Sequence, residues 1–127
     1  MLAQVRNYIA SLGIADAVTI GKIDDSKTNV IGIYGDGYQR RIESIGLHSS
    51  YDVAGVRILY HGTKNLKDTE DVARSLYSQI RYITHTDMSD VHVQYLDLQY
   101  DEPVFVGSDS FGVYEYVIPC VIYYSRG

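Results

Sequence analysis

The sequence of 127 residues has no tryptophan, two phenylalanines, two prolines and a single cysteine, Cys120. One cysteine excludes an internal disulfide and the cysteine clusters of structural zinc sites. Cys120 stands within the apolar stretch 116–124, so we expect a buried structural thiol. Stability must come from an apolar core. The chain can build one, since 46% of its residues are apolar and 21% are charged.

Positive charge is also scarce. Eleven Lys and Arg stand against 16 Asp and Glu, which gives a formal net charge of −5. This balance argues against a general nucleic-acid binder, which carries an excess of basic residues on one face. An acidic surface repels phosphate, however, and so suits a protein through which DNA passes unbound.

Long apolar runs are missing as well. No segment has the length needed to cross a bilayer, and the N-terminal residues 1–12 lack the continuous apolar run of a signal peptide. We therefore expect a protein that is made and folded in a cytoplasm and that has no membrane partner.

Tyrosine is the abundant aromatic residue, with 13 copies. Its ring has a flat apolar body and a polar tip, which suits half-buried sheets and protein interfaces. This composition favours a protein that associates with others.

Two segments have the period of an amphipathic helix. In the first, Leu2, Val5, Ile9 and Leu12 recur at spacings of three and four, and Gly13 follows as a residue that can end a helix in the left-handed conformation. The second is predicted over 69–83.

This second helix is the clearest in the sequence. Its apolar stripe includes Val72, Leu76, Ile80 and Ile83, and we expect this stripe to pack on a sheet. Asp68 and Thr69 are its candidate N-caps.

Several β-branched or alternating segments predict strands. They are the stretch holding Val18, Ile20 and Ile23, then 30–34, 53–61, 91–96, 103–106 and 113–124. The first two are expected to form a hairpin through the polar segment 24–29, and 35–37 is expected to be a turn or loop. Segment 40–50 has no clear pattern. Pro119 lacks a backbone donor, which predicts an edge or a bulge at that position.

The elements do not alternate regularly between strand and helix. They predict a single α+β domain over residues 1–127, with a largely antiparallel or mixed β-sheet and two main helices packed on one face.

The densest group of metal-ligating residue types is His85, Asp87, Asp90 and His92. Two histidines and two carboxylates could hold a metal ion or support a small metal-dependent enzyme. Their spacing matches no metal motif, and His85 and Asp87 fall in a predicted loop. A solvated polar turn is the favoured interpretation.

The remaining polar residues give no coherent catalytic site. His48 and His61 are isolated, and His61 is interpreted as a hydrogen-bonded structural residue. Asp24 and Asp25 lack the rest of a calcium-binding loop, and Gly35-Asp36-Gly37 is too short for a phosphate loop. We therefore expect no enzyme activity, cofactor or bound metal.

A series of segments resembles a known protein family. The series consists of 24–29 before 30–34, then 35–37, 56–62, 68–73, 103–107 and 113–116. It resembles the minor capsid and tail terminator (tail completion) proteins of long-tailed bacteriophages, and it covers most of the chain.

The resemblance implies a virion protein at the head–tail junction, which caps the tail tube as a ring and ends its polymerisation. It also implies a homo-oligomer, usually a hexamer, in contact with the tail tube protein and the head connector protein, with DNA passing through unbound. Candidate lumen or interface residues are Asp24, Asp25, Asp36, Arg40 and Arg41. The alternatives are another head–tail connector, such as a neck or head-completion protein, a minor capsid protein, or a binding module of host origin.

Overall fold

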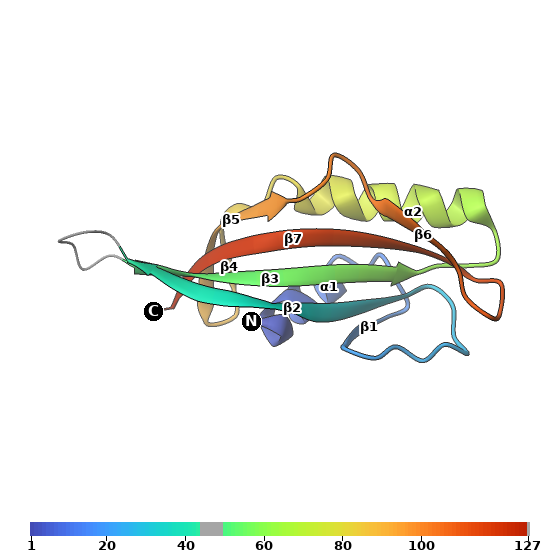
Figure 1. Ribbon diagram of the computed structural model, residues 1–127, viewed down its shortest axis with the longest axis horizontal. Coiled ribbons are helices and arrows are strands. Elements are labelled where there is room, and N and C mark those ends of the chain that lie inside the picture. Colours follow the sequence, from blue (N-terminus) through green and yellow to red (C-terminus); the bar gives the residue numbers. More distant parts are fainter. Residues whose placement is uncertain (44–49, 127) are drawn as a thin grey trace.

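The structure is a computed structural model that describes residues 1–43 and 50–126, with the side chains of 37–51 and 126 outside that description. The described chain forms two helices and seven strands, shown in Figure 1. They are α1 (Leu2–Ser11), β1 (Ala17–Ile20), β2 (Val30–Glu43), β3 (Ser50–His61), α2 (Leu66–Ile80), β4 (Thr84–Met88), β5 (Val91–Leu98), β6 (Val104–Ser108) and β7 (Tyr114–Arg126).

The strands form one curled sheet, a half-barrel, in the order β1-β2-β3-β7-β5-β4, with β6 paired to β7. The β1–β2 pair is parallel, whereas the other five pairings are antiparallel. The sheet is therefore mixed, which agrees with the predicted largely antiparallel or mixed sheet.

The predicted first hairpin is wrong. β1 runs parallel to β2, with Ala17 beside Val30 and Ile20 beside Ile33. The connection 21–29 must therefore carry the chain back to the start of β1. Ile23 was predicted to belong to the first strand, but it lies in the connection, where its side chain is still buried. It packs from the connection onto Gly32, where an added Cβ would lie 2.8 Å from Ile23 Cγ2.

The predicted turn at 35–37 is also wrong, because these residues lie inside β2. The β2–β3 register shifts between Gly35 and Gln39, which is the mark of a β-bulge, and glycine is common at such sites. Beyond the bulge the pairing continues to Glu43 opposite Ser50. Segment 40–50, which had no clear pattern, thus holds the end of β2 and the start of β3.

Both predicted helices are present, and both contribute to one apolar cluster. α1 buries Val5 and Ile9, and α2 buries Leu76 and Ile80. The strands supply further members, among them Ile31, Ile33, Val56, Ile58, Ile118, Ile122 and Tyr124. The expected packing of the α2 stripe is confirmed: Leu76 and Ile80 are fully buried, Ile83 is nearly so, and Val72 is partly buried against the cluster.

The N-cap of α2 is Asn65, so the predicted caps are wrong. Asn65 Oδ1 accepts a hydrogen bond of 3.0 Å from the backbone N–H of Asp68. Thr69 is instead fully buried, and its hydroxyl donates to the Asn65 carbonyl at 2.9 Å.

Pro119 lies in the central strand β7, and not at an edge or a bulge. On one side of β7, β6 pairs with residues up to Val117 and β5 begins at Cys120. The Pro119 carbonyl accepts from Gln99 N–H on this side. The nitrogen of a strand residue points to the same side as its carbonyl. The position where Pro119 lacks an N–H therefore faces the gap between β6 and β5, so no hydrogen bond to a partner strand is lost.

Strand β4 was not predicted. Its sequence, Thr-His-Thr-Asp-Met, is polar except at Met88, which is also its one buried position. It pairs with β5 at the end of the sheet.

Candidate functional site

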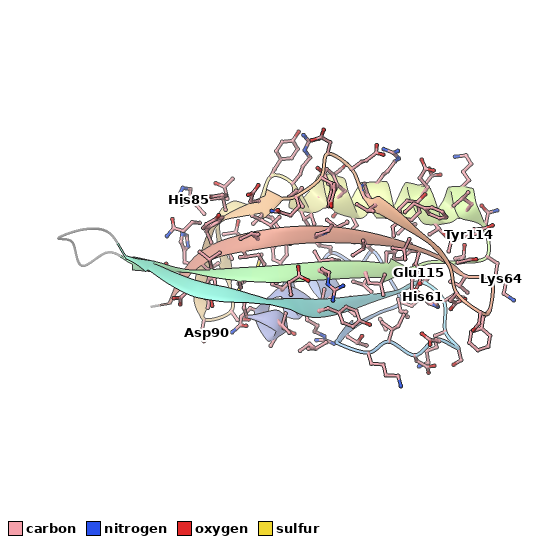
Figure 2. All side chains as sticks on the ribbon, viewed as in Figure 1. His61, Lys64, His85, Asp90, Tyr114 and Glu115 are labelled. Carbon is pink, nitrogen blue, oxygen red and sulfur yellow. The ribbon has the colours of Figure 1, made fainter. Side chains whose placement is uncertain are left out.

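The candidate site is a buried histidine at the end of β3. The β3–β7 register places His61 opposite Glu115. The His61 side chain is fully buried, and its Nδ1 lies 2.9 Å from Glu115 Oε2. Figure 2 shows the two residues at one end of the sheet, near Lys64 and Tyr114. The hydrogen-bonded role predicted for His61 is thereby confirmed.

A second carboxylate approaches the same ring from the turn between β6 and β7. Asp109 Oδ2 lies 3.7 Å from His61 Nε2, and neither atom has a hydrogen-bond partner. The other oxygen, Oδ1, accepts from the N–H groups of Phe111 and Val113 at 2.9 and 3.0 Å. One carboxylate therefore both shapes the turn and faces the histidine.

Opposing influences act on the pKa of Asp109. Desolvation by burial raises it, but the Val113 and Phe111 amides, His61 and Lys64 all lower it. The net pKa is below the ordinary value of an aspartate, so this carboxylate is ionised at neutral pH.

The backbone around His61 is tightly bonded. Gly62 donates to the Tyr114 carbonyl at 2.9 Å and accepts from Asn29 N–H at 2.8 Å. A Cβ at Gly62 would overlap the Thr69 side chain, so only glycine fits there. Because the ring is enclosed in this way, it cannot reach a substrate in solution. The arrangement can fix the β6–β7 turn at the end of β3.

A second histidine–carboxylate group lies on the β4–β5 hairpin. His92 Nδ1 is 2.7 Å from Asp87 Oδ1, and the His85 ring lies 5.8 Å from the His92 ring between centroids. Asp90 instead accepts a hydrogen bond of 2.8 Å from Gln4 Nε2, and Figure 2 shows it at the turn of the hairpin, at the opposite end from His85.

The structure thus brings together three of the four residues of the predicted polar group, and it separates Asp90. His85 and Asp87 belong to β4 and not to a loop, which corrects the prediction. Among the residues that the structure describes, no group of three or more His, Cys, Asp or Glu is arranged to hold a metal ion.

The acidic residues named as lumen candidates lie in two different settings. Asp24 and Asp25 lie in the connection 21–29. The pKa of Asp24 is lowered, first by a hydrogen bond from the Ser26 hydroxyl and then by one from the Ser26 backbone N–H. Asp36 does not project in a loop, because it lies in β2 and pairs with Arg57, whose Nε is 2.5 Å from Asp36 Oδ1.

The basic candidates Arg40 and Arg41 lie in β2, where their backbones pair with Val53 and Asp52. Their side chains are outside the described residues, as is the whole of His48.

We define the outer face of the sheet as the face of β2, β3 and β7 that carries Asp36, Arg57 and Tyr123. Two of the grooves on this face are as follows. One has a volume of about 400 Å³ and is lined by Asp36, Gly55, Asp97, Gln99, Cys120, Val121 and Tyr123. The other, of about 190 Å³, is lined by Tyr34, Arg57, Leu59, Val106 and Val117.

Two buried groups titrate far from neutrality. Desolvation raises the pKa of the Cys120 thiol to about 12, and the charges of Asp36 and Asp97 act in the same direction. The thiol is 1% exposed, which confirms the expected buried cysteine. Desolvation also raises the pKa of Tyr60 to about 12, and its hydroxyl donates to Asn29 Oδ1 at 2.7 Å.

Comparison with known proteins adds no relative: no family model matches the chain, and no curated protein matches it. Within the described residues, neither helix has the length and apolar character needed to cross a membrane.

Sequence reasoning missed Asp109 and Glu115 as partners of His61. They stand 48 and 54 positions away: the β6–β7 turn brings Asp109 near, and the β3–β7 register brings Glu115 near. The available signal was local: Asp109 lies in the segment between the predicted strands 103–106 and 113–124, and an aspartate in a turn commonly accepts bonds from the next backbone amides.

Proposed function

We propose that this protein is a structural subunit of the virus head–tail junction, which caps the tail tube as a closed ring, expected to be a hexamer, and ends tube polymerisation. Its proposed place is the virion, between the tail tube protein and the head connector protein. It has no catalytic role in this proposal. DNA passes through the ring without specific binding.

The observation that carries this proposal is the partly exposed apolar and aromatic surface of the outer face. Tyr34, Leu59, Val117, Val121 and Tyr123 are only partly buried there, and two grooves run between them. Partly buried tyrosine and aliphatic side chains beside grooves are typical of protein interfaces. In the proposed subunit both helices lie on the inner face, which leaves the outer face for neighbours.

The edges of the sheet give further support. β1 pairs with only the first four residues of β2, so the described part of β2 beyond Ile33 has β3 as its one partner strand. At the opposite end of the sheet, β4 pairs with β5 alone. Two different edges on one subunit permit head-to-tail contacts, and such contacts close into rings when the rotation allows it.

The charge balance fits the proposed channel. The sequence carries a net charge of −5, and an acidic lumen would let DNA pass without binding. Asp24, Asp25 and Asp36 are proposed lumen or interface residues, and Arg40 and Arg41 are proposed for contacts with an acidic neighbour.

The experiment that tests the function is deletion of the gene from the virus, with electron microscopy of the products. Loss of a tail terminator gives tails of uncontrolled length, and supplying the protein in trans restores normal length. Tails of normal length that fail to join heads would overturn the terminator role in favour of a neck protein. Normal virions would overturn the whole proposal.

A further inference from the structure

The larger groove of the outer face, of about 400 Å³, is acidic, and we call it the acidic groove. Asp36 and Asp97 line it, and both charges help desolvation to raise the pKa of Cys120, which also lines it. Asp36 is already paired with Arg57. The exposed carboxylate of Asp97 has no ion pair with any residue that the structure describes. The acidic groove therefore has a negative charge available for a cation from outside.

An aromatic surface and an amide adjoin this charge. Tyr123 lines the acidic groove, and its ring stacks on that of the half-exposed Tyr95 with centroids 4.5 Å apart. Gln99 also lines it, and the Gln99 amide oxygen is a further acceptor near Asp97. A carboxylate, an amide oxygen and a tyrosine ring together suit a guanidinium, which donates several hydrogen bonds and stacks on aromatic rings.

A group of matching chemistry projects from the connection between α2 and β4. Tyr82 is 74% exposed, and the Arg81 guanidinium lies over its ring, with Cζ 5.0 Å from the centroid. Arg81 also lies 5.8 Å from the Tyr77 centroid. Within the described residues its guanidinium has no carboxylate or carbonyl partner. The other arginines with described side chains each have a hydrogen bond or an ion pair: Arg6, Arg57 and Arg74.

We propose that Arg81 and Tyr82 of one copy of this chain enter the acidic groove of a second copy, with the Arg81 guanidinium on Asp97 and the Tyr82 ring against Tyr123. The charges of the two surfaces are complementary. Neither Arg81 nor Tyr82 lines the groove of its own chain, so the contact joins two copies.

The connection and the acidic groove are different surfaces of one subunit, so the contact is head-to-tail. Such contacts close into rings when the rotation between neighbours permits it. This inference rests on the proposed function, for which it names the contact between neighbouring subunits of the ring.

Charge reversal tests the contact in the full chain. Arg81→Glu places a carboxylate against Asp97, and Asp97→Arg places two guanidinium groups against each other. Each variant alone should raise the dissociation constant for self-association about tenfold or more, because like charges at a contact repel. Sedimentation velocity across a concentration series measures this constant. Both side chains are exposed, so circular dichroism should show the parent fold in both variants.

The two variants should complement each other. In an equimolar mixture, alternating copies pair either the two parent residues or the two reversed residues, so the oligomer should return. The double variant Arg81→Glu/Asp97→Arg should assemble alone for the same reason. Lys22→Glu and Asp16→Arg reverse exposed charges elsewhere, and these matched controls should assemble like the parent.

Assembly of both single variants like the parent would overturn this contact and leave the proposed ring standing. So would a loss of assembly that neither the mixture nor the double variant restores, or an equal loss in the two controls. A parent chain that stays monomeric at every concentration would also overturn the contact. Deletion of the gene would then decide the capping role separately.

Discussion

Two histidine–carboxylate contacts of nearly equal length lie in different parts of this molecule: Figure 2 shows His61 and Glu115 at the end of the sheet opposite to His85, whose ring neighbours that of His92. His61 meets Glu115 at 2.9 Å with side chains 0% and 17% exposed, whereas His92 meets Asp87 at 2.7 Å with side chains 39% and 81% exposed. The shorter contact is the more solvated one. By distance alone, the exposed pair would be expected to contribute more to stability. We expect the opposite order, because water screens the exposed pair, whereas a buried polar group is costly once its partner is removed.

The largest effect is expected from Glu115→Ala. This change leaves Nδ1 of a fully buried ring without its hydrogen-bond partner, and breaking such a buried histidine–carboxylate pair from one side costs about 3–5 kcal/mol. The free energy of unfolding, measured by urea denaturation, tests this. Glu115→Gln is the matched control, since its amide oxygen can still accept the bond and should restore part of the loss. A cost below about 1 kcal/mol for Glu115→Ala would mean that the buried His61–Glu115 pair contributes no more to stability than an exposed pair.

Leu76→Ala calibrates this comparison with a site that has no charge. Leu76 is fully buried on α2 within the apolar cluster, so its truncation should cost about 2–5 kcal/mol through lost transfer energy and a cavity. The same urea measurement applies. An effect near zero would mean that the α2 stripe does not pack on the core as the structure shows.

Acid should loosen the buried end through Asp109. Its pKa is lower in the folded protein than its ordinary value, so its contribution to stability is fully present above the ordinary value of 3.8. That contribution is lost as pH falls through the lower, folded pKa. Acid unfolding monitored by circular dichroism should therefore depend less on pH in this range for Asp109→Asn than for the parent. Identical pH profiles would show that Asp109 is not coupled to folding.

The smallest effect is expected at the exposed end. Asp87→Ala removes the partner of His92, but both side chains face solvent, so the free energy of unfolding should change by less than about 1 kcal/mol. The change should shrink further in high salt, because exposed charges are screened. A loss as large as that of Glu115→Ala would show that burial does not separate the two pairs.

Periodicity was sufficient for the helices and most strands, but not for their pairing. The stripes through Val5 and Ile9, and through Leu76 and Ile80, predicted which residues would be buried. The parallel β1–β2 pair was missed because a short polar connection between two strands normally indicates a hairpin. β4 was missed because only one of its side chains, Met88, is buried, so its sequence has no apolar alternation.

Less of the candidate site than of the fold could be predicted from the sequence. His61 was singled out, but its partners depend on the register of β3 with β7 and on a turn that folds over the strand end. Such contacts between distant segments are set by tertiary structure, and no local pattern around His61 encodes them. The polar group His85, Asp87 and His92 was found because its members lie close in sequence, yet its histidine–carboxylate pair is the more exposed of the two.

The central claim is that the chain forms a closed ring through its own surfaces. The most direct measurement is its mass by sedimentation velocity across a concentration series, alone and with the proposed partner, a tail tube protein from the same genome, followed by electron microscopy of the largest species. The account predicts one discrete oligomer, expected to be a hexamer, whose mass stops rising with concentration and whose images show a ring. A monomer at every concentration that also fails to bind the tube protein, or growth without limit, would contradict it.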